Sequence, residues 1–385
     1  MTNPLTQLRR AAGGGLDGVR NRWETAPGAV RWAVYLLLIL GALVLPSDAI
    51  GSVMSPRTDW ATLLFNPIGI YVLLAIGLNV VVGQAGLLDL GYVAFFAIGG
   101  YAMAMLGTKL HWDFWVILVA GVLISALSGV VLGAPTLRLR GDYLAIVTLG
   151  FGEIVRIVAN NTDSIGGPNG ISGIPHPPTI ADVAIGDVHP LRYGILDPRP
   201  YYYLLVAICV LVIIFVRRLE HSRVGRSWAA IREDEEAAEI MGVPTYRFKL
   251  LAFAIGASIG GAAGVVFASK VISITPMDFP FILSATILAA VVLGGSGNLP
   301  GVILGAFVMA WLPEFLRGVS PSGQDFSQYR TIAFAGLLVA MMIWRPEGLL
   351  PSRRRKAEFA EGTGGLGGLG AEVTGPDTSS AEVTR

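Results

Sequence analysis

Charged residues are scarce in this chain, and so are cysteine and histidine. Asp, Glu, Lys and Arg make up only 14% of the 385 residues, whereas hydrophobic residues make up 53%. A charge content this low excludes most soluble enzymes and is typical of a polytopic membrane protein. The single cysteine, Cys209, excludes an internal disulfide and a multi-cysteine metal site, and we expect it to be a small core residue.

Neither sign of charge is in excess, because 28 basic residues face 27 acidic ones. Net charge therefore argues for neither a nucleic acid nor an acidic partner. The chain also lacks the Gly-x-x-x-x-Gly-Lys-Ser/Thr loop that binds nucleotide phosphates. We expect it not to hydrolyse ATP itself, and we expect no cofactor and no metal.

Apolar runs are what the sequence has in abundance. Ten of them are candidate membrane helices, although several are shorter than the ~20 residues that a bilayer-spanning helix needs. This predicts an all-α fold of about ten transmembrane helices, some of them tilted, broken or re-entrant. The ten runs cover about 32–45, 63–82, 88–106, 114–132, 143–158, 201–216, 250–268, 281–293, 302–316 and 331–344.

The distribution of Lys and Arg predicts the orientation, because cytoplasmic segments of membrane proteins are rich in both. With the N-terminus inside, 20 basic residues fall on the inner side and seven on the outer side. Ten spans with both termini cytoplasmic fit this asymmetry, and an even miscount of spans would leave it unchanged. We expect a cytoplasmic segment 1–31, a transmembrane domain 32–350 with a cytoplasmic loop 217–249, and a disordered cytoplasmic tail 351–385 that is rich in Gly, Ser and Thr.

Polar side chains interrupt the apolar pattern around Asp89. Asn79 and Gln84 precede it, and the stretch Gly83–Tyr92 is rich in glycine. An ionised Asp in the middle of a bilayer costs ~2.5 to 3.5 kcal/mol. Asp89 is therefore expected either to face a cavity or a partner, or to cap a helix near the cytosolic surface. Both interpretations keep it off the lipid.

A second interruption lies in the run 143–158. Glu153 and Arg156 are three residues apart and share one helix face, where an ion pair would lower the cost of burying both charges. Arg156 is also close enough to the end of the run to extend toward the interface instead.

The loop 217–249 contains a helix-forming stretch that ends at Gly242, ahead of Pro244. We expect one short cytosolic helix there, with an apolar arc suited to the groove of another protein. The alternative, a solvated connector, explains the charges of this stretch but not its tryptophan. At about 100° per residue, the predicted arc holds Trp228, Ile231, Ala238 and Met241.

Several motifs resemble those of one transporter family. Glu236-Ala237-Ala238-x-x-x-Gly242 resembles the cytoplasmic docking loop of ABC importer permeases, although the Ile-x-Leu-Pro that often follows is absent. Four further motifs resemble branched-chain amino-acid ABC permeases of LivM type, and they extend the resemblance over about 63–350. These are Gly77–Phe95, Arg138–Ile154, Gly166–Ile171 and Gly294–Gly301.

The resemblance implies a transport subunit of the bacterial inner membrane, in contact with lipid and not with nucleic acid. It implies a LivH-type permease partner, two cytosolic ATPases of LivG and LivF type, and an extracytoplasmic binding protein that delivers a branched-chain or other hydrophobic amino acid. Urea or a short amide stays open as the substrate. The residues expected along the translocation path are Asn79, Gln84, Asp89 and Glu153, and those expected to couple to the ATPases are Trp228, Ile231, Glu236, Ala237, Ala238 and Gly242.

Two alternatives come from other classes of protein. Gly294–Gly297 also matches the Gly-x-Ser-Gly of rhomboid-type proteases, but no histidine base follows Ser296, so a tight turn between packed helices is the better interpretation. The other alternative is a stand-alone secondary transporter or channel for a small polar solute. A faint internal repeat, Val81-x-Gly83-x-x-Gly86-x-Leu88 against Val292-x-Gly294-x-x-Gly297-x-Leu299, is compatible with it. Copurification with ATPases would separate the two.

The exterior segment 160–200 is rich in glycine and proline. Loops this long are usually either functional or disordered. The family resemblance favours a segment that is partly ordered over the pore mouth and helps to receive the binding protein, while a flexible spacer is the alternative.

Overall fold

A computed structural model describes residues 37, 41–47, 51, 59–137, 142–179, 192–194, 197–318, 336 and 348–350. The chain divides into two compact units, Met1–Ala61 and Thr62–Arg385, and each is considered by itself. In the first unit the indole nitrogen of Trp60 donates a hydrogen bond to the carbonyl oxygen of Leu45 (2.8 Å). The predicted segments 1–31 and 351–385 lie outside the described residues, and so do most of the predicted spans 32–45 and 331–344.

From Trp60 onward the described chain is built mostly of helices, joined in places by short turns, and the first of these helices begins in the last two residues of the first unit. In chain order these are the span Trp60–Gln84, which contains α4 (Trp60–Leu63), η1 (Leu64–Gly69), α5 (Ile70–Leu78) and η2 (Asn79–Gln84), then α6 (Val93–Lys109), α7 (Phe114–Thr136), α8 (Asp142–Asn161), η3 (Asp163–Ile165), η4 (Gly167–Asn169), α9 (Arg199–Glu220), α10 (Arg223–Glu233), α11 (Glu235–Ile240), α12 (Thr245–Val271), η5 (Pro276–Asp278), α13 (Phe281–Gly294) and α14 (Leu299–Gly318). Two strands, β1 (Ile171–Ser172) and β2 (Ser273–Ile274), pair antiparallel.

Eight of the ten predicted runs coincide with helices of the described part of the chain. Six of these helices are long and apolar enough to cross a membrane, and Val93–Lys109 and Leu299–Phe315 are shorter apolar helices. The chain is therefore a mostly helical, multi-pass membrane protein. The helices differ in length, as predicted. The span Trp60–Gln84 is kinked, and a stretch without helical structure precedes α6.

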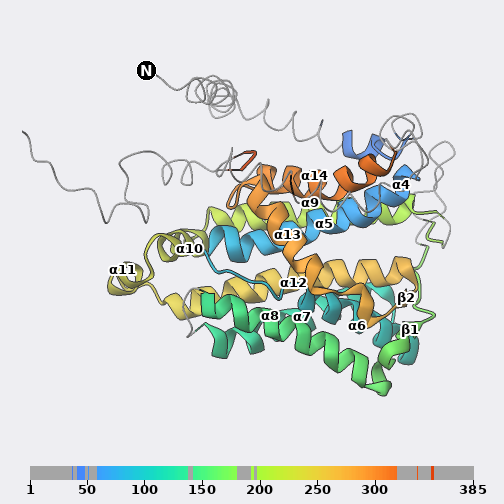
Figure 1. Cartoon of the computed structure of the whole chain (residues 1–385), viewed down its shortest axis with the longest axis horizontal. Coiled ribbons are helices and arrows are strands. Elements are labelled where there is room, and N and C mark those ends of the chain that lie inside the picture. The colour runs from blue at the N-terminus through green and yellow to red at the C-terminus, as the bar shows by residue number, and fades with distance from the viewer. Residues whose placement is uncertain are drawn as a thin grey trace, which may run out of the picture. The chain divides into compact units, whose positions relative to one another are not determined.

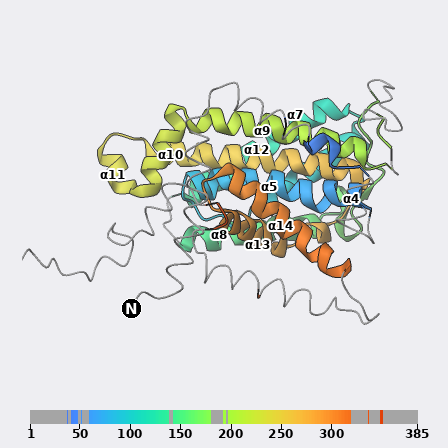
Figure 2. The same ribbon diagram turned by 90° about the horizontal axis from the view of Figure 1, so that it is seen from above.

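Helix α12 lies at the centre, packed against α5, α6 and α7, and it stays alongside α5 in both views (Figures 1 and 2). Glycines allow these backbones to approach one another closely. A Cβ atom on Gly264 would lie 2.1 Å from the carbonyl oxygen of Phe96, and one on Gly261 would lie 2.2 Å from the Ser125 hydroxyl oxygen. The glycines of α12 thus permit close helix crossing. Van der Waals contact between such surfaces is what holds membrane helices together.

The span Trp60–Gln84 leads into the most irregular part of the bundle. Its backbone leaves helical geometry at Asn66, because the residue before Pro67 is restricted to extended conformations. After Gln84, residues 85–92 run without helical structure until α6 begins. The Tyr92 hydroxyl donates to the carbonyl oxygen of Gly256 (2.8 Å), which is near the middle of α12. Segment 85–92 therefore reaches the middle of the neighbouring spans as non-helical chain.

The loop 217–249, which the sequence predicts to be cytosolic, holds two helices rather than the single one predicted. Helices α10 and α11 project from one end of the bundle (Figures 1 and 2), and the chain is extended at Asp234 between them. The Asp234 carboxylate accepts hydrogen bonds from the backbone nitrogens of Glu236 (2.9 Å) and Ala237 (3.0 Å). Aspartate competes for its own backbone in this way and favours a new helix start over helix continuation.

We predict that Gly264 cannot carry a side chain without loss of stability. Gly264→Ala should cost about 1 to 3 kcal/mol, because the methyl group would meet the backbone of α6. Gly150→Ala is the matched control, since a Cβ atom there meets nothing within 4 Å. Thermal unfolding of the detergent-solubilised protein measures both, and equal midpoints for the two variants would contradict the prediction.

Candidate translocation path and cytosolic helices

The backbone of segment 85–92 is hydrogen-bonded by side chains from neighbouring helices. The Thr148 hydroxyl of α8 accepts from the nitrogen of Leu90 (3.0 Å), and the Ser284 hydroxyl of α13 accepts from that of Val93 (3.0 Å). The Asp89 carboxylate accepts from the nitrogen of Gly91 (2.9 Å). Asp89 therefore stabilises its own turn and does not cap α6, whose first nitrogen is bonded by Ser284. It is fully buried and faces no lipid.

Several buried polar atoms in this region have no hydrogen-bond partner among the described residues. They are Nδ2 of Asn79, both side-chain polar atoms of Gln84, Oδ2 of Asp89 and the hydroxyl of Tyr101. Each such group costs about 1 to 3 kcal/mol if nothing polar reaches it. Three of the four residues are ones that the sequence singled out as path residues. Tyr101 was missed, because a tyrosine in an apolar helix gives no signal of its own.

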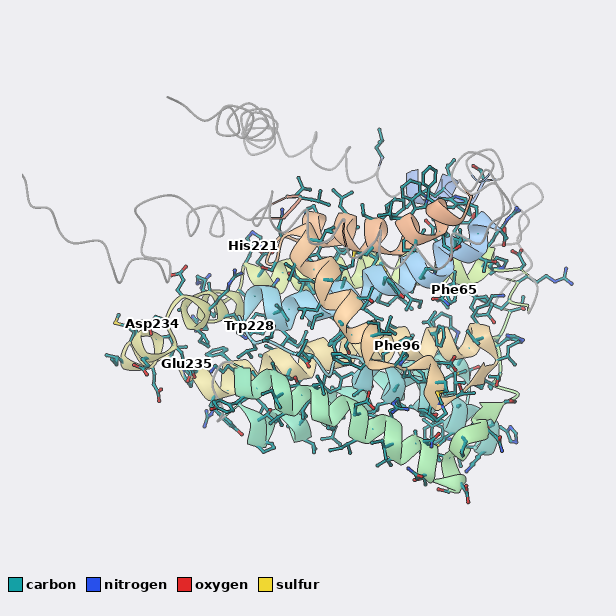
Figure 3. All side chains as sticks on the ribbon, in the orientation of Figure 1. Phe65, Phe96, His221, Trp228, Asp234 and Glu235 are labelled. Atoms are coloured by element: carbon teal, nitrogen blue, oxygen red, sulfur yellow. The ribbon has the colours of Figure 1, made fainter. Side chains whose placement is uncertain are left out.

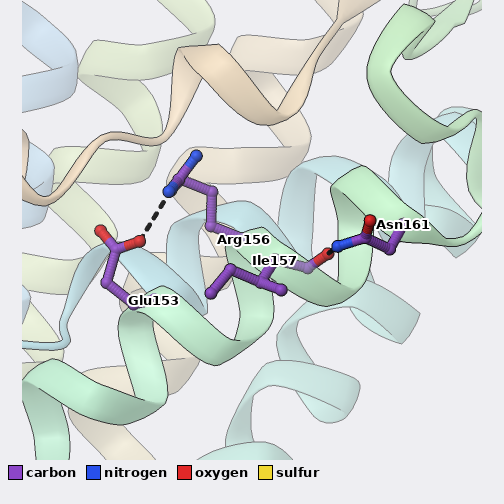
Figure 4. A network of polar contacts seen from close by, with 4 residues as sticks. All are labelled: Glu153, Arg156, Ile157 and Asn161. Atoms are coloured by element: carbon purple, nitrogen blue, oxygen red, sulfur yellow. Dashed lines mark hydrogen bonds and ion pairs between the residues drawn. The ribbon is translucent and has the colours of Figure 1, made fainter.

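Glu153 and Arg156 form an ion pair, which is one of the two alternatives that the sequence left open. The Arg156 Nε atom lies 2.8 Å from Oε2 of Glu153, and their side chains are 31% and 32% exposed in this chain (Figure 4). The neighbouring Gly152 packs against Gly91, so the pair lies next to segment 85–92. A half-exposed ion pair in the second half of the 20-residue α8 is costly against lipid. This face of α8 therefore needs a protein or water-filled surface opposite it.

Helices α10 and α11 are fixed to α12 by their apolar arc. Trp228 is fully buried, and its indole nitrogen donates to the carbonyl oxygen of Phe248 (2.7 Å). Ile231 and Ala238 are also buried, and Glu235 forms an ion pair with Lys249. Figure 3 shows Trp228 on the side of α10 toward the bundle, with Asp234 and Glu235 farther out.

The exposed end of α11 differs from the surface predicted for docking. Trp228, Ile231 and Ala238 are covered by this chain, whereas Ile240 and Met241 are 86% and 83% exposed. Met241 does not share the buried arc as predicted, because the break at Asp234 changes the phase of the second helix.

The other predicted coupling residues are exposed as well. Glu236 and Ala237 are exposed on α11, and Gly242 follows it with a positive φ of 86°. Such a left-handed glycine is a common way for a helix to end.

At the end of the bundle that the sequence predicts to be outside, the structure describes residues 162–179. Strand β1 pairs with β2 after α12, with Ile171 opposite Ile274. The imidazole Nδ1 of His176 lies 2.6 Å from the Tyr201 hydroxyl, which ties this segment to α9. Burial, together with the nearby charge of Lys270, lowers the pKa of His176, so the ring is neutral at pH 7. The part 180–191 lies outside the described residues.

In the described part of the chain no three His, Cys, Asp or Glu residues could hold a metal ion. Ser296 lies in the turn between α13 and α14. A Cβ atom on Gly294 would be 2.2 Å from the carbonyl oxygen of Gly301. The glycines around Ser296 thus make a tight turn between packed helices, as the sequence predicts.

We predict that the outer turn is structurally required. Gly170 and Gly173 both have positive φ angles, of 70° and 79°, but only a Cβ atom on Gly170 would collide, 2.0 Å from the carbonyl oxygen of Ile274. Gly170→Ala should therefore accelerate proteolysis of this segment more than Gly173→Ala, which shares the positive φ but whose Cβ atom meets nothing within 4 Å. Identical proteolysis of both variants would show that the segment is a spacer.

The comparisons with known proteins agree in one family. Residues 61–344 match the sequence model described as branched-chain amino acid transport system / permease component. The chain is 42% identical over 370 residues to the high-affinity branched-chain amino acid transport system permease protein LivM of Escherichia coli K12, covering 92% of this chain and 84% of that protein. It is 44% identical over 307 residues to LivM of Salmonella typhimurium, covering 76% and 70%.

A second kind of permease component is also related. LivH of Escherichia coli K12 is 25% identical over 293 residues, which cover 73% of this chain and 91% of that protein. No solved structure matches the chain.

Proposed function

The chain belongs to the branched-chain amino acid permease family, and from this premise we propose that it is the membrane permease subunit of an ATP-driven importer of branched-chain or other hydrophobic amino acids. The observation that carries the proposal is the 42% identity to LivM over 92% of this chain. As a permease component it is not an enzyme, and ATP hydrolysis belongs to separate ATPase subunits. The family favours this function over a stand-alone carrier.

We place the ATPase contact at the exposed end of α11. Ile240 and Met241 are large apolar side chains that protrude from a helix too short and too polar to lie in the membrane. Exposed apolar side chains of this kind are typical of protein contacts. Glu236 and Ala237 are exposed on the same helix. Trp228, Ile231 and Ala238 support coupling indirectly, by holding the helix pair against α12.

We place the translocation path along the face formed by segment 85–92, α8 and α13. Non-helical backbone at membrane depth is tolerated only against protein or a water-filled cavity. Gly86 and Leu88 are nevertheless exposed in this chain. A LivH-type permease opposite this face would cover it, and the unpartnered polar atoms of Asn79, Gln84 and Asp89 would bond water or the polar groups of the solute.

The remaining partners follow from the family. Two ATPases of LivG and LivF type would bind at the α10–α11 end, and an extracytoplasmic binding protein would bind at the ordered outer segment around β1. With this arrangement the protein resides in the bacterial inner membrane.

The direct test is reconstitution of the chain with LivH-type, LivG-type, LivF-type and binding-protein partners in proteoliposomes. ATP-dependent uptake of leucine, isoleucine and valine is expected, with urea and acetamide transported poorly. Uptake that proceeds without the ATPases would instead favour the stand-alone carrier.

We predict that Glu236→Arg weakens coupling, because it reverses a charge on the exposed face of α11. Leucine uptake should fall by about tenfold, with less ATPase copurifying. Glu220→Arg is the matched control, since Glu220 is exposed at the end of α9 and outside the docking helix. Equal uptake by the two variants would contradict this docking site.

We predict that Asp89→Leu inserts into the membrane but transports poorly. The substitution removes the hydrogen bond to Gly91 and a buried polar atom beside the path. Asp89→Asn keeps the shape and one acceptor oxygen, and should retain more uptake. Uptake by Asp89→Leu at the wild-type rate, at equal protein levels, would exclude Asp89 from the path.

A further inference from the structure

Arg232, the last basic residue of α10, contacts two glycine turns that are far apart in the sequence. Its guanidinium Nη1 donates to the carbonyl oxygen of Gly83, at the end of η2. A Cβ atom on Gly86 would lie 2.9 Å from Cγ of Arg232, and one on Gly297 would lie 2.9 Å from Nη1. The side chain of Arg232 therefore passes over the turn around Gly83 and Gly86 and ends beside the turn around Gly297.

The two turns also contact each other directly. The nitrogen of Gly297 donates to the side-chain oxygen of Asn79 (2.8 Å). A Cβ atom on Gly83 would lie 2.5 Å from that same nitrogen. Because there is no room for a side chain at this contact, movement of one turn has to be shared by the other.

The contacting turns are the two halves of the faint repeat in the sequence. Gly86 and Gly297 occupy the same position of the repeat, and both have a positive φ, of 74° and 84°. The turn around Gly83 and Gly86 connects η2 to segment 85–92, and the turn around Gly297 joins α13 to α14. Arg232 thus reaches two turns that connect membrane segments of the chain.

We propose that Arg232 is a positioning residue of the transport cycle, which transmits movement of the cytosolic helices to both glycine turns. The inference rests on the proposed function, in which ATPases move α10 and α11. An arginine suits this position, since its planar group offers several donors in fixed directions. The carbonyl of Gly83 is an acceptor at a helix end, where carbonyl groups lack partners within the helix.

Loss of Arg232 should disconnect both glycine turns from α10 without releasing α10 and α11 from α12. Trp228, one helical turn earlier, still bonds the carbonyl oxygen of Phe248, and Glu235 still pairs with Lys249. The cytosolic helices would then remain docked on α12 while segment 85–92 and the α13–α14 turn no longer follow them. The expected defect is uncoupling of ATP hydrolysis from uptake, and not unfolding.

The experiment uses the full chain in complex with its partner subunits in proteoliposomes. Arg232→Met removes the donor and keeps the length of the side chain, and Arg223→Met is the matched control, because Arg223 is exposed on the same helix. Leucine transported per ATP hydrolysed should fall by about tenfold in Arg232→Met and stay near the wild-type value in Arg223→Met. A wild-type ratio in Arg232→Met would overturn the proposal.

A second measurement separates this proposal from the proposed function. If the wild-type complex takes up no branched-chain amino acid, the proposed function fails, and amide hydrogen exchange of the solubilised chain then decides on Arg232. The amide of Gly297 should exchange about tenfold faster in Arg232→Met and unchanged in Arg223→Met. Unchanged exchange of the Gly297 amide in both variants would overturn the link between Arg232 and the glycine turns.

Should Arg232→Met fail to accumulate, Arg232→Lys is measured in the same way. An intermediate loss supports the proposal, and wild-type values overturn it.

Discussion

A non-helical segment at membrane depth is the constraint around which this protein is organised. A bilayer offers no water to bond backbone polar groups outside helices. Thr148 of α8 accepts from the nitrogen of Leu90, and Asp89 accepts from that of Gly91. Ser284 of α13 accepts from the nitrogen of Val93, where α6 begins. A segment held from three directions in this way fixes where α6, α8 and α13 lie relative to one another.

Helix α12 provides the surface on which this arrangement rests. Its glycines let α6 and α7 approach to backbone contact, and the carbonyl of Gly256 accepts from the Tyr92 hydroxyl at the end of the non-helical segment. The first turn of the same helix binds the cytosolic pair through Phe248 and Lys249. One helix therefore connects the cytosolic helices, the proposed path and, through β2, the outer segment.

The sequence located the polar positions but not their bonding. Asn79, Gln84 and Asp89 stand out because polar residues are rare in apolar runs. A polar or charged side chain that faces lipid is costly, and polar atoms of all three side chains are buried. The alternative of Asp89 as a helix cap was wrong, since α6 is capped by Ser284 from a helix almost two hundred residues later. No local pattern encodes such a contact. In the same way, the docking helix was predicted from its composition, but its break at Asp234 was not.

The sequence by itself determined the mostly helical membrane class, the positions of eight apolar helices and the family, because these depend on apolar run length and on motifs that are local in the chain. Only the tertiary structure decided which faces of those helices are covered. It buried Trp228 and left Ile240 and Met241 exposed. It also brought Gly83, Gly297 and Arg232 together. The physical reason is that both choices depend on contacts between residues far apart in the chain, and hydrophobic periodicity along one segment carries no information about which other segment will pack against it.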